Sequence, residues 1–337
     1  MTAANNHRPP PLAISVVVPV RNEADSIGLL LDLLLTQTLR PDEIVIADGG
    51  STDRTREIIE GFIAQGMPVK IVSEEFSMPG RARNQGVRNA RNHWIAFTDG
   101  GIRPEHDWLE QLAAGADQTP EADAIYGTYD PVINNFFEEC AAIAYVPPAE
   151  ETGAGRVRPY SIVSALMRRE AWERVGGFPE DLRSAEDLLF MRNVERAGFR
   201  TVRAPAAIVH WTIQPNLWRT FRRFVAYSKN NMRAGLWREW QAAIFVRYAM
   251  LLATAFPAIF FGWWWLMVPA GLWLAMMIAR AATSIHRNRT SFPAGLGRNL
   301  ARILLLVPII AAIDAASFLG TLEWLVRDRS GVQKSNR

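Results

Sequence analysis

The stretch Ile14-Ser-Val-Val-Val-Pro-Val-Arg-Asn-Glu23 decides the fold class, because a short apolar run ends abruptly in polar residues. Similar apolar runs recur at 43–47, 69–72 and 93–97, and amphipathic stretches at 27–35, 55–64 and 81–90 separate them. This alternation predicts strands and helices in βαβα order, which form a mostly parallel sheet covered by helices. Ligands of such sheets bind at the carboxyl ends of the strands. The polar residues that follow each apolar run are therefore the candidates for a site.

The region 134–211 is less regular. Residues 147–155 are rich in proline and glycine, which predicts a mobile loop. A strand over 161–167, a helix over 185–197 and a short apolar strand over 206–209 are expected after it.

Three polar clusters directly follow predicted strands. They are Pro19-Val-Arg-Asn-Glu23, Ala47-Asp-Gly-Gly-Ser-Thr-Asp53 and Phe97-Thr-Asp-Gly-Gly101. Asp48 ends its strand and can accept hydrogen bonds from a base or a ribose, while glycines allow a ligand to approach the backbone closely. Each cluster alone is equally typical of an ordinary turn with a helix cap.

Together, in this order and spacing, the clusters resemble the family 2 glycosyltransferases of the GT-A fold. Members of that family read Val-Pro-Val-x-Asn-Glu, then Asp-(Asp/Gly)-Gly-Ser-Thr-Asp, then Asp-x-Asp, and the resemblance covers residues 14–211. It implies an α/β GT-A nucleotide-sugar-binding domain with a mostly parallel sheet. It also implies that the nucleotide sugar is bound by the residues that match these motifs, namely Pro19, Arg21, Asn22, Glu23, Asp48 and Gly49.

The segment Gly80-Arg-Ala-Arg-Asn-Gln-Gly86 matches a further family stretch. The resemblance places Arg81 and Asn84 beside the nucleotide, where Arg81 can neutralise diphosphate charge. For Arg83 and Arg88, the solvated face of a basic helix is an equally good interpretation.

The resemblance makes Asp99 the first carboxylate of Asp-x-Asp, which binds the ribose and a divalent cation, Mg²⁺ or Mn²⁺. Such a cation neutralises the leaving diphosphate. Gly101 stands where the family has its second carboxylate, and Gly49 stands where a second Asp often follows the second strand. His210 matches a position at which many GT-A enzymes supply a metal ligand, although a histidine at a strand end is more often structural.

The acceptor side is expected at Ser184-Ala-Glu-Asp-Leu-Leu-Phe190, which follows Val175-Gly-Gly-Phe-Pro-Glu180. It resembles the family's Glu-Asp motif, in which a carboxylate takes the proton of the acceptor hydroxyl. An inverting transfer needs only one positioned base. We assign that role to Asp187, with Glu186 as its orienting neighbour; the alternative is a pair of acids that stabilise a helix start.

Composition limits the partners. The net charge of +3 is too small to indicate nucleic acid. The single cysteine, Cys140, cannot form an intrachain disulfide, so a reducing compartment is allowed. Residues 1–13 are polar and proline-rich, which predicts a flexible lead without the apolar core of a signal peptide. The predicted glycosyltransferase domain then occupies 14–213.

The remaining chain predicts a membrane anchor. Residues 214–241 interleave tryptophans with arginines, as in an interfacial amphipathic helix, or in a solvated basic helix packed on the domain.

The region 242–326 holds apolar runs for two membrane-crossing helices and a third one that contains Asp314. Arg247, the one charge within 242–279, is expected to reach the headgroups. A central Asp costs only about 3 kcal/mol on insertion scales, so we expect three spans; the alternative is a two-helix hairpin with a re-entrant third segment. Residues 327–337 form a basic tail.

These observations predict an inverting glycosyltransferase that moves one sugar from a nucleotide-diphosphate sugar to a lipid-linked or cell-envelope glycan acceptor. The expected location is the plasma (inner) membrane, with the catalytic domain in the cytosol. The segment Thr220-Phe-Arg-Arg-Phe224 lacks the Gln and Trp of the processive synthase motif Gln-x-x-Arg-Trp. The alternatives are a polyprenyl-phosphate glycosyltransferase, a processive polysaccharide synthase and an inactive sugar-nucleotide-binding protein.

Overall fold

The computed structural model describes residues 12–153 and 155–328. Most of the predicted flexible lead and basic tail lies outside these residues. The chain forms two compact units. The first holds the segments up to Tyr129, Tyr160–Glu180 and Phe190–His210, and the second holds Asp130–Pro159, Asp181–Leu189 and the segment from Trp211 onward. The second unit thus takes two segments from inside the region 14–213.

The first unit is built on an eight-stranded sheet in the order β3-β2-β1-β4-β9-β6-β10-β5. Its parallel half consists of β1 (Ile14–Val20), β2 (Glu43–Asp48), β3 (Val69–Ser73) and β4 (Trp94–Phe97). Next to β4 lies antiparallel β9 (Ala165–Arg168), followed by β6 (Ala124–Val132), β10 (Thr201–Thr212) and β5 (Ile102–Pro104). The predicted α/β fold with a mostly parallel sheet is confirmed.

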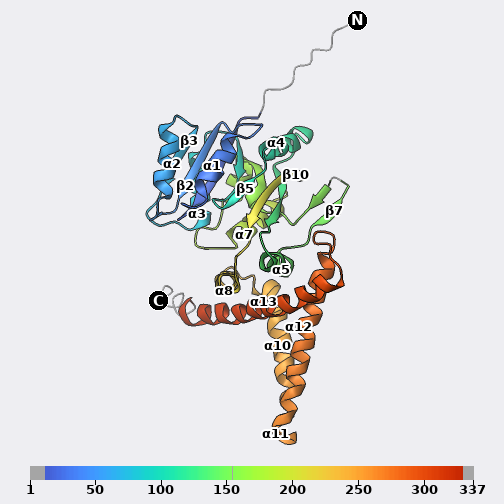
Figure 1. Cartoon of the computed structure of the whole chain (residues 1–337). Helices are drawn as coiled ribbons and strands as arrows, with labels where there is room; N and C mark the ends of the chain where they lie inside the picture. The colour runs from blue at the N-terminus through green and yellow to red at the C-terminus, as the bar shows by residue number, and fades with distance from the viewer. Residues whose placement is uncertain (1–11, 154, 329–337) are drawn as a thin grey trace. The chain divides into compact units, whose positions relative to one another are not determined.

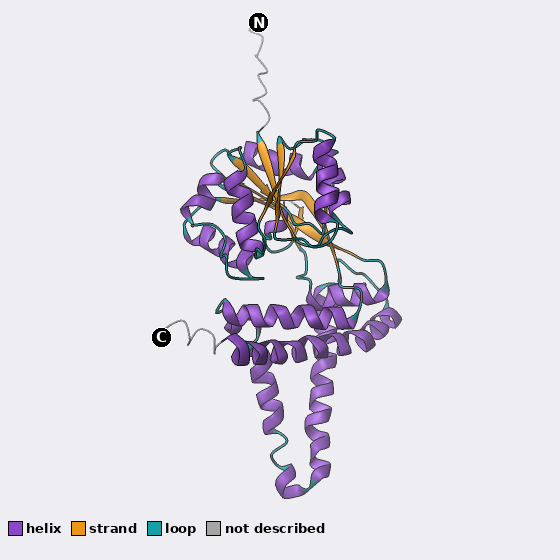
Figure 2. Cartoon of the chain, turned by 90° about the vertical axis from the view of Figure 1, so that its left-hand side faces the viewer, coloured by secondary structure: helices purple, strands orange, loops and turns teal. Residues whose placement is uncertain are grey.

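Helices cover both faces of this sheet (Figure 2). They include α1 (Ile27–Leu35), α2 (Thr55–Ala64), α3 (Pro79–Asn89), α4 (Trp108–Gln118) and α6 (Arg169–Arg174). Helix α1 buries four apolar side chains at helical spacing, Ile27, Leu30, Leu31 and Leu34. Burial of a side chain of this size stabilises the fold by about 2 kcal/mol, so this stripe fixes which face of α1 meets the sheet.

An aromatic cluster continues the core toward α7 (Glu186–Arg196). The rings of Phe178 and Phe190 stack with centroids 3.9 Å apart, and Phe97 meets Phe178 edge-on at 5.5 Å. The Gly-Gly-Phe segment and the middle of α7 are therefore anchored to the end of β4 by apolar packing.

The second unit begins with α5 (Phe136–Tyr145) and a two-stranded ribbon of β7 (Glu150–Thr152) and β8 (Gly155–Val157). The prediction of a mobile loop over 147–155 was wrong for the ribbon residues. Asp130 fixes strand β8 and the residue after it through ion pairs to Arg156 at 2.6 Å and to Arg158 at 3.0 Å. Such long-range ion pairs cannot be inferred from the composition of the loop.

Three stretches of the described chain are long and apolar enough to cross a membrane: Ala242–Phe261, Trp263–Arg287 and Leu296–Asp328. The first contains α10 (Ala242–Ala253) and α11 (Ala258–Phe261), and the second contains α12 (Met267–Arg287). These two stretches form a hairpin that turns at Gly262, whose φ is +93°. The third contains α13 (Leu296–Glu323), which runs crosswise to the hairpin (Figure 1).

Helix α13 packs along α8 (Leu217–Arg233), and the two run side by side in Figure 2. The three apolar stretches differ in how much of them is buried inside the protein. In the most apolar part of the stretch that contains α13, 39% is buried, against 6% and 11% for the two arms of the hairpin. The hairpin therefore exposes its apolar surface along its length, whereas α13 uses much of its own surface for contacts within the protein.

A buried carboxylate fixes the start of α13. Glu139 on α5 binds both Arg298 and Arg302, with 2.6 Å between Arg302 Nη2 and Glu139 Oε1. Arg302 and Glu139 are almost fully buried. Burial opposes ionisation of Glu139, but the hydrogen bonds from both arginines outweigh it and lower its pKa.

The basic residues of α8 do not all face solvent or lipid. Arg233 and Lys229 both approach Asp328, at 2.7 Å and 3.7 Å. Trp218, near the start of α8, keeps 64% of its surface exposed. Part of the predicted amphipathic helix region thus binds the protein itself, and an interfacial role for its exposed aromatic residues stays a prediction.

Candidate active site

Three loops meet at one edge of the sheet in the first unit. Strands β2, β1 and β4 are adjacent and parallel, with Val20 opposite Asp48 and Val17 opposite Phe97. Because parallel neighbours end at the same edge, the polar clusters after these strands lie side by side, as the sequence predicted.

The first two loops are tied together by hydrogen bonds. Asn22 has a left-handed backbone, with φ of +57°, and its Oδ1 accepts a hydrogen bond of 2.8 Å from the Thr52 amide. The Asn22 amide donates to Ser51 Oγ at 2.9 Å, and the Glu23 amide donates to Thr55 Oγ1 at 2.8 Å. These bonds offset the cost of the left-handed conformation, about 1 kcal/mol or more, and shape both loops into one rigid rim. Pro19 and Arg21 flank this rim, and the Arg21 guanidinium lies over the ring of Phe76 at 4.3 Å.

Asp48 is buried at the end of β2. Its Oδ1 accepts from the Ser51 amide at 3.0 Å, whereas Oδ2 makes no hydrogen bond and lies 3.6 Å from Arg56. A buried carboxylate oxygen without a hydrogen bond is costly. A donor group on a ligand, such as a base N–H or a ribose hydroxyl, would satisfy it.

The glycines after Asp48 are required by close backbone contacts. A Cβ on Gly49 would lie 2.9 Å from the Ser77 carbonyl oxygen, and one on Gly50 would lie 2.0 Å from that of Glu75. The absence of a second Asp at 49 therefore follows from the packing of the loop that leads into α3.

Asp99, after β4, is held by Arg83 of α3. Arg83 Nη2 lies 2.7 Å from Asp99 Oδ1, with 4% of the Arg83 side chain and 35% of the Asp99 side chain exposed. The Arg83 guanidinium also lies over the Phe178 ring at 5.5 Å. The solvated-face interpretation is wrong for Arg83, and it suits Arg88, whose side chain is 56% exposed beside Glu180.

Glu23 lies next to the position of the missing second carboxylate. A Cβ on Gly101 would lie 3.9 Å from Glu23 Oε2, in ordinary contact distance. Burial raises the pKa of Glu23; a hydrogen bond from Ser26 opposes this, and the negative charges of Asp99 and Asp53 add to it. Two carboxylates that repel each other at a sheet edge have the donor chemistry that suits a divalent cation.

The two predicted nucleotide contacts on α3 differ. Arg81 is half exposed and pairs with Glu74, with 3.0 Å between Arg81 Nη2 and Glu74 Oε1. Asn84 is buried and uses its full hydrogen-bonding capacity: its amide donates to the Phe178 carbonyl and to Glu180, and its Oδ1 accepts from Trp172 Nε1 and the Phe178 amide. Asn84 thus holds the Gly-Gly-Phe turn. Its contact with a nucleotide stays a prediction.

His210 has a carboxylate partner. Its Nε2 lies 3.0 Å from Glu105 Oε1, and both side chains are partly exposed. Among residues 12–153 and 155–328, no three His, Cys, Asp or Glu side chains converge as a metal cluster. The joint role of Asp99 and His210 as metal ligands therefore stays a prediction.

The predicted catalytic pair belongs to the second unit. Glu186 and Asp187 are the first residues of α7, and Asp187 Oδ1 accepts a hydrogen bond of 2.8 Å from the Leu188 amide. The residue before them, Ala185, has a left-handed backbone with φ of +70°. For a residue other than glycine this conformation is strained, and such strain is often found at functional sites.

Residues 15–175 match the family described as Glycosyl transferase family 2. This part of the chain is a family 2 glycosyltransferase domain. The chain is 27% identical over 220 residues to the uncharacterized glycosyltransferase EpsJ of Bacillus subtilis (strain 168), an alignment that covers 60% of this chain and 62% of EpsJ. It is 28% identical over 277 residues to the succinoglycan biosynthesis protein ExoA of Rhizobium meliloti (strain 1021), covering 77% of this chain and 82% of ExoA.

The fold of this chain is also found among solved structures. It is similar to the mannosyltransferase PcManGT from Pyrobaculum calidifontis in complex with GDP-Man and Mn²⁺, with a TM-score of 0.54 and 20% identity over 94% of this chain and 87% of that chain. At this identity the similarity shows the fold, and it agrees with the GT-A architecture expected from the motifs.

The sequence does not reveal two partner residues of the candidate site. It is equally compatible with a buried Arg83 and with one on the solvated face of a basic helix, and it gives no indication for Glu105. The available signal for Arg83 is its spacing from the apolar Val87, four positions later on the same face of the helix, and both are buried in the structure. For Glu105 the sequence holds no comparable signal, because its partner His210 is 105 residues away.

Proposed function

We propose that this protein is an inverting glycosyltransferase that moves a single sugar from a nucleotide-diphosphate sugar to a lipid-linked or cell-envelope glycan acceptor at the cytosolic face of the plasma membrane. The observation that carries the donor half of this proposal is the meeting of three polar loops, after β1, β2 and β4, at one sheet edge. The family 2 domain supports the reaction class.

The donor nucleotide is proposed to lie on this rim. Asp48, with one oxygen free of hydrogen bonds, would accept from the base or ribose, and the Asn22 loop would line the same pocket. Arg81 would exchange its pairing with Glu74 for the diphosphate, which is a stronger bidentate acceptor. PcManGT binds GDP-Man, a ligand of the proposed class.

A divalent cation would be held by Asp99, with Glu23 in place of a carboxylate at 101 and with His210 as a further candidate ligand. When bound, the cation would neutralise negative charge on the departing diphosphate. The ion pair with Arg83, 2.7 Å long, orients the Asp99 carboxylate at this edge. PcManGT was solved with Mn²⁺.

The acceptor half is assigned to Asp187. In the proposed step the acceptor oxygen attacks the anomeric carbon, the bond from that carbon to the diphosphate oxygen breaks, and Asp187 takes the acceptor proton. Glu186 orients its neighbour. Support comes from their place at the start of α7, directly after the strained Ala185.

The membrane anchor is proposed to be the hairpin of α10, α11 and α12. Helix α12 has 21 residues and is about 32 Å long at 1.5 Å per residue, which is enough to cross the hydrocarbon core. Helix α13 runs crosswise to these helices and is partly buried, which favours a position in the membrane surface. We therefore propose two spans in place of the three expected from hydropathy.

A donor panel tests the function. Purified protein is incubated with UDP-, GDP- and dTDP-sugars and native membranes, and both nucleotide release and radiolabelled product are measured. We expect release with one nucleotide class and a lipid-soluble product longer by one sugar. A polymer would indicate a processive synthase, transfer to a polyprenyl phosphate would give a monosaccharide lipid, and nucleotide binding without turnover would indicate an inactive protein.

A further inference from the structure

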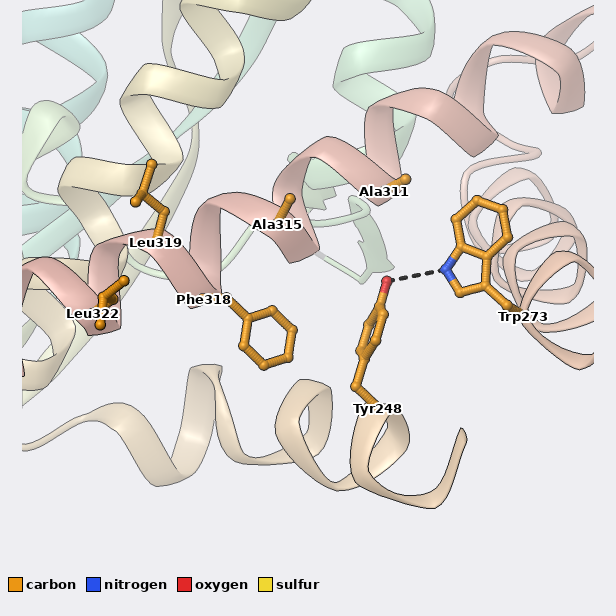
Figure 3. A pocket seen from close by; sticks show the side chains of 7 residues that line it. All are labelled: Tyr248, Trp273, Ala311, Ala315, Phe318, Leu319 and Leu322. Carbon is orange, nitrogen blue, oxygen red and sulfur yellow. Dashed lines mark hydrogen bonds between the residues drawn. The ribbon is translucent and has the colours of Figure 1, made fainter. Parts of the chain in front are cut away.

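An apolar groove lies in the second unit where α13 crosses the hairpin. Its volume is about 610 Å³. Tyr248 of α10 and Trp273 of α12 form one wall (Figure 3). The other wall is a stripe of α13 residues at helical spacing, Ala311, Ala315, Phe318, Leu319 and Leu322.

One end of this groove is polar. The Tyr248 hydroxyl accepts a hydrogen bond from Trp273 Nε1 and lies 3.2 Å from Asp314 Oδ2. Asp314 is fully buried and is bound by Arg280, with 3.0 Å between Arg280 Nη2 and Asp314 Oδ1. The charge of Asp314, which hydropathy places within an apolar segment, is paired with Arg280 and does not face lipid alone.

Arg247 leaves a positive charge beside this polar end. It precedes Tyr248 on α10 and interacts electrostatically with Arg280 and Asp314. Its Nε is buried without a hydrogen bond, and within residues 12–153 and 155–328 no acidic side chain forms an ion pair with it. Two guanidinium groups face one carboxylate, so one positive charge is not compensated. An anion bound at this end would compensate that charge.

We propose that the groove binds the hydrocarbon chain of a membrane lipid whose head is a phosphate, and that Arg247 binds that phosphate. The apolar stripe and the aromatic wall match an alkyl or isoprenoid chain, and the unbalanced charge at one end matches the anionic head. This proposal rests on the proposed function, in which a lipid of this class carries the acceptor sugar. It adds a binding site that lies outside the nucleotide-binding rim.

The site can be tested by binding alone, without donor sugar. The full chain in detergent is titrated with radiolabelled farnesyl phosphate and, in parallel, with farnesol. Ala315→Trp fills the groove from an exposed position on α13. Leu304→Trp places the same side chain at a position on α13 that is 79% exposed and outside the groove. We expect Ala315→Trp to weaken binding of farnesyl phosphate at least tenfold and Leu304→Trp to leave it unchanged.

The phosphate contact is tested with Arg247→Gln and its control Arg247→Lys. Because Arg247→Gln removes a charge-assisted hydrogen bond to the phosphate, it is expected to weaken binding of farnesyl phosphate about tenfold or more, while farnesol binding stays the same. Arg247→Lys is expected to retain most of the affinity. Gel filtration and thermal unfolding verify that each variant is folded.

Several results would overturn the proposal. Equal affinity of Ala315→Trp and Leu304→Trp would exclude the groove as the site. An equal effect of Arg247→Gln on farnesol would exclude the phosphate contact. A change of oligomeric state in Ala315→Trp, with lipid affinity intact, would identify the groove as a contact between copies of the chain. None of these experiments measures sugar transfer. The binding results can therefore be interpreted even if the proposed glycosyltransferase function is wrong.

Discussion

Arg83, inside α3, lies 2.7 Å from Asp99 at the end of β4, and its side chain is almost fully buried. This pair connects a helix to the loop that the motifs assign to the metal and the ribose. A buried guanidinium is stable only with its partner, so the two residues act as one unit.

Arg83→Met is expected to destabilise the protein by about 3 kcal/mol and to weaken donor binding, because Asp99 loses its partner and its orientation. The matched control is Arg88→Met, which removes an exposed ion pair and is expected to cost about 0–1 kcal/mol. Denaturant unfolding and nucleotide titration measure the two effects. Equal stability of the two variants would contradict the structural role of the pair.

Asp187→Asn is expected to remove most sugar transfer while donor binding stays nearly intact, because the carboxylate acts only on the acceptor proton. Transfer is measured with native membranes and donor binding by titration. Glu186→Gln is the matched control and is expected to lose less. A fully active Asp187→Asn protein would refute the assignment.

Transfer is expected to need millimolar Mg²⁺ or Mn²⁺, and His210→Ala is expected to lower the metal affinity further. Gly101→Asp tests the missing carboxylate, since its Cβ meets only Glu23 Oε2, at 3.9 Å. We expect tighter Mn²⁺ binding in Gly101→Asp and weaker binding in Glu23→Gln, measured by titration of the metal. Turnover undiminished in excess EDTA would show a metal-free reaction.

The ion pairs of Glu139 with Arg298 and Arg302 predict that the stability of the fold decreases in acid. The pKa of Glu139 is lower in the folded protein than its ordinary value of 4.5. Ionised Glu139 therefore stabilises the fold fully above that ordinary value, and this stability is lost as the pH falls through the folded-state pKa. The unfolding temperature of Glu139→Gln is expected to be lower at neutral pH and to fall less below about pH 4.5. Glu150→Gln, on the exposed ribbon, is the control; the same acid profile in both variants would contradict the prediction.

Cysteine labelling tests the topology. In a chain with Cys140→Ala, Trp263→Cys at the hairpin turn is expected to react with an impermeant reagent in intact cells, because the turn of a spanning hairpin emerges on the outer side of the membrane. Ser335→Cys is expected to be protected until lysis. Labelling of Ser335→Cys in intact cells would support three spans instead of the hairpin.

The parallel half of the sheet was predicted correctly, because each strand is a short apolar run followed by an amphipathic helix. The predicted strand over 14–20 and the helices over 27–35 and 55–64 have the same bounds in the structure. The local spacing of apolar residues is enough to predict such elements, because it shows which face of each strand or helix is buried.

Contacts between distant residues were not predictable in the same way. Glu139 and Arg302 are 163 residues apart, so neither their ion pair nor the course of α13 follows from local hydropathy. Hydropathy shows whether a helix is long and apolar enough to cross a membrane. It does not show whether that helix runs parallel or crosswise to its neighbours. For Arg83 the helix was predicted, but the side of α3 that meets Asp99 was not.

The crosswise course of α13 has a mechanical consequence for the bilayer. The helix has 28 residues and is about 42 Å long at 1.5 Å per residue. If it lies in one leaflet, it adds area to that leaflet alone, whereas the hairpin adds area to both. The protein then acts as a wedge and prefers a leaflet that is already stretched by curvature.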